Sequence, residues 1–248
     1  MTRIYNTAGA HVPVYDTSGR LMFGDSGTDV PPARTPHPPS GPVANIVTGA
    51  EMASLGRSPV HRDGETMGTN VTARVDATSV VLTWVVARTY GPDAGGTYSA
   101  TLTVAGKVYP VTVGGVTPWR VEVPTNETAV TYKSDPIPVN VLAGDDLLVT
   151  VTVDADGEAG GVSSTLTDGD GGSKWSWRPA RIEATTNIPS WLCIGDSIVQ
   201  QSNSYPGQAC RLRGLPNVTA GVGGDAHLYF PGRWPWRAAP HIPQSTHM

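Results

Sequence analysis

The chain has 248 residues, which is long enough for one large domain or two small ones with hydrophobic cores of their own. Its formal net charge of -4 offers no basic surface to DNA, RNA or an anionic membrane, so we expect no nucleic-acid partner. Its two cysteines, Cys193 and Cys210, exclude a disulfide-dense scaffold and leave either one bridge or two buried thiols.

The first residues, from Met1 to His11, contain no apolar run of the length that a secretory signal needs. No later segment reaches the roughly 20 consecutive apolar residues of a transmembrane helix. We therefore expect neither a standard signal peptide nor a membrane span. If Met1 is the native start, the protein is made in the cytosol and reaches any extracellular site by another route, such as a virus particle.

Residues 1–66 are predicted to form an extended, proline-rich arm. Short apolar patches lie among turn residues, and residues 30–39 are dominated by proline, which removes backbone donors and favours extended geometry. On composition alone the arm is a disordered linker. Docking on another subunit is favoured, because apolar side chains such as Tyr15 and Phe23 are costly to leave in water.

Residues 67–188 are predicted to form an antiparallel β-sandwich of the jelly-roll type, so that the fold class is mainly β. Short runs rich in β-branched and aromatic residues follow one another, and several alternate with a period of two. Turn residues such as Ala105-Gly106 and Gly114-Gly115 separate these runs. No helical pattern interrupts them, which favours a sandwich. The expected strands cover residues 71–75, 79–86, 98–104, 107–113, 119–123 and 146–153.

Residues 189–248 are predicted to form a partial α/β segment. A strand at 191–194 is followed by a helix, capped by Asn203 or Ser204 and ending at Gly214, and by a second strand at 217–220. Two parallel strands with one helix leave the other face of the sheet uncovered. We therefore expect this segment to pack against the sandwich or another chain, or to continue into further α/β elements.

Ser197 comes directly after the first of these strands, where a serine hydroxyl can project at the sheet edge near a helix N-terminus. Residues 192–198, Leu-Cys-Ile-Gly-Asp-Ser-Ile, resemble the first conserved block of the SGNH (GDSL-type) hydrolases. Residues 217–225, Asn-Val-Thr-Ala-Gly-Val-Gly-Gly-Asp, resemble their second block. The resemblance implies that Ser197 is the nucleophile and that the N–H groups of Ser197 and Gly224 stabilise the oxyanion. It implies no cofactor and no metal.

The similarity covers residues 70–230, because the segments before Ser197 resemble the β-sandwich that precedes the catalytic domain in actinobacterial SGNH esterases. A second Gly-Asp-Ser, at residues 24–26, leads into a proline-rich segment instead of a helix and is not favoured as a site. Two blocks in order with a helix pattern between them are the stronger signal.

The later blocks of the family have no counterpart in the sequence. The third block carries an Asn, but no Asn follows Asn217. The last block is Asp-x-x-His, and no histidine after Ser197 has an Asp three residues before it; these histidines are His227, His241 and His247. Because a serine hydroxyl without a base is a poor nucleophile, we expect the 248 residues alone to be inactive. They are either the front part of a longer polypeptide or a reduced remnant of the domain.

Two functions fit this sequence. In the first, favoured by the arm, the missing signal peptide and the missing base, the chain resembles actinobacteriophage minor tail proteins. It is then an oligomeric virion component that contacts other tail subunits through residues 1–66 and displays an SGNH-like region outward. In the second, the chain is a secreted or cell-surface hydrolase of carbohydrate or lipid esters of the cell envelope, with Ser197 as nucleophile.

Overall fold

The computed structural model describes residues 41–52, 65–87, 94–123, 130–155, 162–166, 179–195 and 205–221. The predicted fold class is confirmed, since the described chain is mainly β and its sheets form a sandwich-like arrangement. Helix α2 (Tyr205–Leu212) lies in the chain between the last two strands. The strands are β1 (Val43–Asn45), β2 (Thr48–Met52), β3 (Glu65–Thr72), β4 (Ala77–Ala87), β5 (Ala94–Val104), β6 (Lys107–Val111), β7 (Trp119–Val123), β8 (Val130–Lys133), β9 (Ile137–Val141), β10 (Asp146–Ala155), β11 (Val162–Leu166), β12 (Arg181–Thr185), β13 (Trp191–Gly195) and β14 (Asn217–Gly221).

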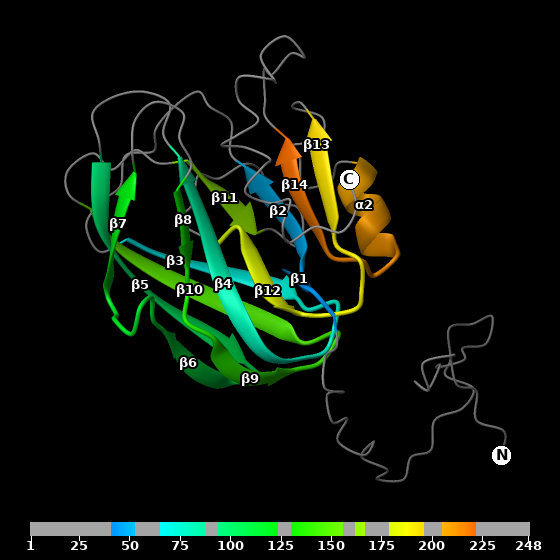
Figure 1. Ribbon diagram of the computed structural model, residues 1–248, viewed down its shortest axis with the longest axis horizontal. Coiled ribbons are helices and arrows are strands. Elements are labelled where there is room, and N and C mark those ends of the chain that lie inside the picture. The colour runs from blue at the N-terminus through cyan, green and yellow to red at the C-terminus, as the bar shows by residue number, and fades with distance from the viewer. Residues whose placement is uncertain are drawn as a thin grey trace, which may run out of the picture. The chain divides into compact units, whose positions relative to one another are not determined.

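The strands form two sheets (Figure 1). The five-stranded sheet has the order β3-β10-β5-β6, and β7 also pairs with β5. The nine-stranded sheet has the order β1-β12-β4-β11-β2-β14-β13, and β8 and β9 both pair with β4. The described pairs are antiparallel except for β13 with β14 and β14 with β2, which are parallel. An antiparallel sandwich therefore carries a short parallel extension at one edge.

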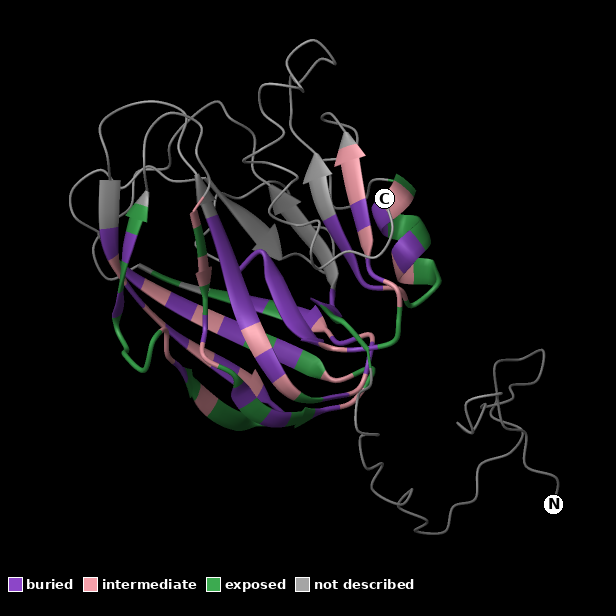
Figure 2. Ribbon diagram, viewed as in Figure 1, coloured by how far each residue is buried: buried purple, intermediate pink, exposed green. Residues whose placement is uncertain are grey.

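Hydrophobic side chains of both sheets meet in one core. Trp84 of β4 lies against Trp119 of β7 with ring centroids 5.2 Å apart, and Tyr98 of β5 lies 6.1 Å from Trp119. Figure 2 shows buried residues alternating with less buried ones along the sandwich strands. On β10 the buried side chains are Leu147, Val149, Val151 and Val153. This period of two is the one predicted from the sequence, because successive side chains of a strand point to opposite faces.

The turn between β5 and β6 shows why glycine stands in the sequence there. Ala105 and Gly106 both have positive φ, at 49° and 77°. A two-residue hairpin loop with two positive φ angles is of type I′, the form whose twist matches that of the flanking strands. The turn predicted at Ala105-Gly106 is therefore confirmed with its expected backbone conformation.

Asp135 lies between β8 and β9, and its side chain is hydrogen-bonded to the second predicted turn, the one at Gly114-Gly115. Its carboxylate accepts hydrogen bonds from the hydroxyl of Thr112 at 2.6 Å and from the N–H of Gly115 at 2.7 Å. These hydrogen bonds favour the charged form and hold the pKa of Asp135 below its ordinary value. A single carboxylate thus holds this turn in place, and the alternation of apolar residues in the sequence did not indicate that contact.

Several strands were not expected from the sequence, and they share a departure from simple alternation. Strand β9 contains Pro138, which cannot donate to a ladder, and among the described strands β9 pairs with β4 alone. Strand β12 has a charged residue at Arg181 and another at Glu183. Proline at a sheet edge and charge on a buried strand both lower strand propensity, so local pattern could not identify these elements.

The boundary of the arm differs from the sequence expectation. Residues 43–45 and 48–52, expected within the arm, form β1 and β2 of the nine-stranded sheet, where β1 pairs with β12 and β2 pairs with β11 and β14. These stretches are short and lack apolar alternation, so their pairing with distant strands could not be seen in the sequence. Residues 1–40 and 53–64 lie outside the described residues, and docking of the arm stays a prediction.

The C-terminal strands do not form a separate layer. Strand β14 pairs with β2, and through β2 the parallel strands continue the nine-stranded sheet of the sandwich. Leu192 of β13 and Val218 of β14 are buried in the same core as the sandwich residues. Among the expected alternatives, β13 and β14 thus show packing against the sandwich, whereas residues 222–248 lie outside the described residues.

Candidate active site

The carboxyl ends of β13 and β14 lie side by side (Figure 1). The two strands are parallel and in register from Trp191 with Asn217 to Gly195 with Gly221. Ligands of α/β sheets bind beyond the carboxyl ends of parallel strands, because loops and helix N-termini converge there. The chain reaches Ser197 two residues after Gly195. It reaches Gly224 three residues after Gly221, so both candidate segments leave the sheet from neighbouring strand ends.

The candidate catalytic residues themselves, Ser197 and Gly224, lie outside the described residues. So do His227, His241 and His247, the histidines that were compared with the family's base. The roles of Ser197 and Gly224 therefore stay predictions, and the described structure contributes the strands from which they follow.

Helix α2 connects β13 to β14 and contacts both of these strands and β2. Pro206 is its second residue, within the first turn as predicted from the sequence. Gly207 and Cys210 are its buried residues, and positions three apart lie on one helix face. The helix therefore turns the face with Gly207 and Cys210 away from solvent.

The helix ends in a Schellman motif, as the glycine in the sequence indicated. The N–H of Leu215 donates to the carbonyl of Cys210 at 2.8 Å, and the N–H of Gly214 donates to that of Arg211 at 3.0 Å. Gly214 has a φ of 63°, a conformation that costs glycine little. The end predicted at Gly214 is confirmed, and the chain then turns directly into β14.

Cys193 of β13 and Cys210 of α2 are free thiols. Cys193 is half-buried and Cys210 is buried. The hydrogen bond with Cys210 and then burial raise the pKa of the Cys193 thiol, whereas the hydrogen bond with Cys193 lowers the pKa of Cys210. Of the two alternatives left by the sequence, the structure shows unbonded thiols.

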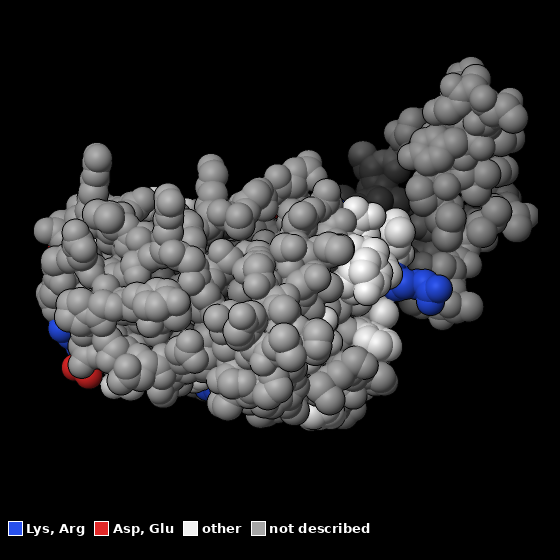
Figure 3. Space-filling model, turned by 90° about the horizontal axis from the view of Figure 1, so that it is seen from above, with Lys and Arg blue, Asp and Glu red and all other residues white. Residues whose placement is uncertain are grey.

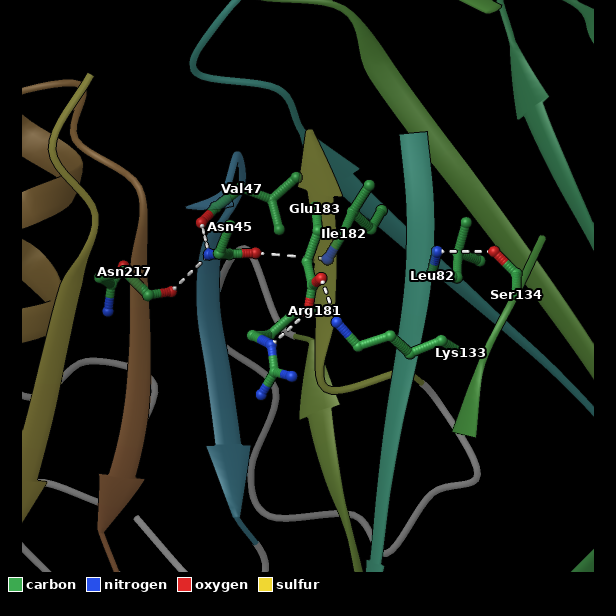
Figure 4. Close-up of polar contacts among 9 residues, drawn as sticks. All are labelled: Asn45, Val47, Leu82, Lys133, Ser134, Arg181, Ile182, Glu183 and Asn217. Atoms are coloured by element: carbon green, nitrogen blue, oxygen red, sulfur yellow. Dashed lines mark hydrogen bonds and ion pairs between the residues drawn. The ribbon is translucent and has the colours of Figure 1, made fainter. Parts of the chain in front are cut away.

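Asn45 fastens the parallel strands to the sandwich (Figure 4). Its side-chain amide donates to the carbonyl of Val47 at 2.7 Å and to that of Asn217 at 3.2 Å. Its side-chain oxygen accepts a hydrogen bond from the N–H of Ile182 at 3.3 Å. One fully buried side chain thus joins β1, β12 and β14, and it orients the strand that leads to Gly224.

Strand β12 carries a buried ion pair near Asn45 of β1 (Figure 4). Arg181 and Glu183 are two residues apart, so they share a face of the sheet, and both side chains are at most 1% exposed. The carboxylate of Glu183 accepts from Nε of Arg181 at 2.8 Å and from Nζ of Lys133 at 3.0 Å. Sequence reasoning missed this cluster. Its one signal is a charged i, i+2 pair flanking the apolar residue Ile182.

Among the described residues, metal chemistry adds no second site. In the view of Figure 3 the described charged side chains are scattered and form no single patch. Within the described ranges no group of three or more His, Cys, Asp or Glu residues could hold a metal ion. No helix among these residues is long and apolar enough to cross a membrane.

No protein-family model matches this sequence, and no curated protein sequence matches it. Among solved structures, the chain is similar to a family two carbohydrate esterase from Clostridium thermocellum, in complex with cellohexaose, at 15% identity and a TM-score of 0.23, covering 73% of this chain and 51% of that one. It is similar to the CBM22-1-GH10 modules of a xylanase 10B from Clostridium thermocellum, in complex with xylohexaose, at 8% identity and a TM-score of 0.23. The match covers 67% of this chain and 36% of that one. It is also similar to a GDSL-like lipase from Bacteroides ovatus, at 13% identity and a TM-score of 0.17, and the match covers 66% of this chain and 44% of that one. The chain thus spans about half or less of the length of each of these proteins.

Proposed function

We propose that the carboxyl edge of β13 and β14 is part of a serine ester hydrolase site. Ser197 is its nucleophile, and the N–H groups of Ser197 and Gly224 stabilise the oxyanion of the tetrahedral intermediate. The observation that supports this proposal is the in-register pairing of Gly195 with Gly221 on parallel strands. It brings the two blocks that resemble SGNH hydrolases to one edge of one sheet.

The general base is the part of this mechanism for which the sequence offers no residue. A serine hydroxyl attacks an ester carbonyl efficiently when a neighbouring base removes its proton. No Asp-x-x-His follows Ser197 in the 248 residues. We therefore assign to this chain the nucleophile and the oxyanion donors, and not the base. The substrates that we propose are carbohydrate or lipid esters of a cell envelope.

Chemical rescue tests this assignment. With p-nitrophenyl acetate as substrate, the chain alone should hydrolyse no faster than Ser197→Ala, since no base is present. Added imidazole should produce a rate that depends on Ser197. A positioned base contributes about 10²–10⁴-fold, so we expect free imidazole to give less, on the order of tenfold over Ser197→Ala.

Ser26→Ala is the matched control, because it removes the serine of the other Gly-Asp-Ser tripeptide. This variant should keep the imidazole-dependent rate of the unaltered chain. Equal rates for the unaltered chain and Ser197→Ala in imidazole would contradict the site. A Ser197-dependent rate without imidazole would instead show that the chain supplies its own base.

We also propose an assembly role, in which the chain is a virion component of the phage tail type and residues 1–40 dock on neighbouring subunits. The support for this proposal is the sequence of the arm, where short apolar patches are followed by a proline-rich stretch at residues 30–39. The described sheet begins at Val43, and Thr186 donates a hydrogen bond to the carbonyl of Pro42. The described strand pairs all lie after position 41, so we expect the sheets to fold without residues 1–40.

Removing residues 1–40 should separate assembly from folding. The shortened chain should keep the β-type circular dichroism of the full chain and its cooperative unfolding. It should be absent from purified particles that incorporate the full chain, as measured by quantitative mass spectrometry of both. Incorporation of the shortened chain at the normal level would show that the arm is a linker and not a docking element.

A further inference from the structure

An open groove of about 500 Å³ lies between the two sheets of the sandwich. One wall is the β5–β6 hairpin of the five-stranded sheet, and the other is formed by β9 and the start of β4 in the nine-stranded sheet (Figure 1). This volume falls within the range of about 300–1,000 Å³ that small-molecule sites occupy. None of the lining residues belongs to β13 or β14, so the groove is separate from the candidate active site.

The wall formed by β4 and β9 contains an irregularity of the sheet. The register of the two strands shifts between Ala77 and Ser79, so that Val139 and Asn140 of β9 lie opposite the single residue Thr78 of β4. A shift of this kind is produced by a β-bulge, which re-aims side chains at the margins of sheets and beside functional sites. Thr78, Val139 and Asn140 all line the groove, so the irregular part of the ladder is the part that faces it.

The opposite wall places a cation over an aromatic ring. The turn at Ala105-Gly106 leads directly into Lys107, the first residue of β6. The Nζ atom of Lys107 lies 4.9 Å from the centre of the Tyr109 ring, within the distance at which a ring attracts an ammonium group. Tyr109 itself packs against the hydrophobic core, which fixes the ring. The ammonium group of Lys107 is thus held at the groove while its side chain remains exposed.

The charge of the groove is positive in a protein whose net charge is -4. The described residues that line it include Lys107 and no Asp or Glu. Within the described part of the chain, the ammonium group of Lys107 has no carboxylate partner. A ligand carboxylate would therefore meet a cation there without displacing an ion pair of the protein.

The remaining lining combines polar side chains with apolar surface. Thr78 and Asn140 are exposed, and their side chains form no hydrogen bond with any described residue. A hydroxyl and an amide can each donate and accept, so both can bind the hydroxyl groups of a ligand. Val104 and Pro138 add apolar surface beside them. This combination suits a sugar ring, which has hydroxyl groups at its rim and C–H groups on its faces.

We propose that this groove binds an acidic saccharide, a sugar chain in which one or more rings carry a carboxylate. The carboxylate pairs with Lys107, and ring hydroxyls form hydrogen bonds with Thr78 and Asn140. The proposal does not depend on Ser197 or on ester hydrolysis. It assigns to the sandwich a binding function of its own, which would hold the chain on glycans that contain uronic acids.

An NMR titration of the isotopically labelled full chain tests the proposal. The probes are a trimer of galacturonate and a tetrasaccharide of alternating glucuronate and N-acetylglucosamine, with galactotriose as the neutral match for the first. At least one acidic probe should cause saturable shifts in the amides of Lys107, Tyr109 and Asn140, and added salt should weaken its binding. If the galacturonate trimer binds, galactotriose should bind about fivefold more weakly, the factor that an exposed ion pair contributes at most.

Variants separate the charge from the shape of the groove. Lys107→Met should weaken binding of the acidic probe by about fivefold and leave binding of galactotriose unchanged, whereas Lys107→Arg should keep most of the affinity. Asn140→Ala should weaken the acidic and the neutral sugar by the same factor, because its amide contacts hydroxyl groups. Lys133→Met is the matched control, since it removes an exposed lysine that does not line the groove, and it should bind as the unaltered chain does.

Four outcomes would overturn the proposal. Neither acidic probe might shift the groove amides saturably, which would show that the groove is not such a site. Equal affinity for the galacturonate trimer and galactotriose would contradict the role of the carboxylate. Equal affinity for a tetraglutamate peptide would contradict the selection of a sugar. Equal losses in Lys107→Met and Lys133→Met would show that net charge, and not the groove, determines binding.

Discussion

Replacing Glu183 by glutamine should lower the free energy of unfolding by about 3–5 kcal/mol, the range observed when one partner of a buried ion pair is removed. The glutamine keeps the size of the side chain and removes its negative charge. Arg181 would then lose this negatively charged partner at a position where its side chain is fully buried. Arginine cannot relieve this cost by losing its proton, because its pKa lies far above neutral pH.

The electrostatics of Arg181 explain why the expected loss is large. Burial lowers the pKa of its guanidinium, and the charge and hydrogen bond of Glu183 oppose that shift. The guanidinium has thus lost water as a partner, and Glu183 supplies part of the compensation. Denaturation by urea, with the slope of the transition checked to be unchanged, measures the loss.

Lys133→Met is the matched control for the same carboxylate. Lys133 also contacts Glu183, at 3.0 Å, but 46% of its side chain is exposed. An ion pair with an exposed partner contributes about 1 kcal/mol or less, so this variant should be close to the unaltered chain. If Glu183→Gln and Lys133→Met lowered the free energy of unfolding equally, burial of the partner would not determine how much each ion pair contributes.

The elements that could be predicted are those in which local pattern and tertiary position agree. Strand β10 alternates strictly, and its apolar side chains enter the core as the alternation indicates. The turn at Gly106 and the end of α2 at Gly214 require backbone conformations that glycine adopts readily, so the residue type predicts the geometry. Local chemistry was sufficient in these cases.

The elements that could not be predicted are those whose stability comes from distant partners. Strand β12 carries Arg181 and Glu183 inside the protein, and their burial is tolerable because each has the other as a partner. Strands β1 and β2 are short and gain their hydrogen bonds from β12, β11 and β14, which follow more than a hundred residues later. The hydropathy pattern along the chain cannot predict pairings between strands so far apart in the sequence.

The same distinction applies to the candidate site. The order of a strand, a helix and a second strand around Ser197 could be predicted, and the structure confirms β13, α2 and β14. The attachment of these elements to the sandwich rests on the pairing of β14 with β2 and on hydrogen bonds of Asn45, a polar residue with no pattern around it. The burial of Cys210 depends on how α2 lies on the sheet, so the spacing of the cysteines alone did not predict it.

Replacing Asn45 by alanine should lower the free energy of unfolding by about 2–3 kcal/mol and should loosen the candidate site before the rest of the sandwich. The side chain is fully buried and makes three hydrogen bonds, to Val47, Asn217 and Ile182. Removing it leaves buried backbone groups without that partner, at about 1–3 kcal/mol for each group that finds no other. The methyl group of alanine also leaves part of the volume empty.

Hydrogen exchange shows where this loss occurs. Amides of β13 and β14 in Asn45→Ala should exchange faster by at least about tenfold, the factor that corresponds to 1.4 kcal/mol, while those of β10 should change less. Asn140→Ala is the control, because Asn140 is an exposed asparagine on β9 of the same sheet and its loss should cost less than about 0.5 kcal/mol. Faster exchange spread evenly over both sheets would mean that Asn45 supports the sandwich as a whole. Faster exchange confined to β13 and β14 would mean that one buried amide holds the strands from which Ser197 and Gly224 follow.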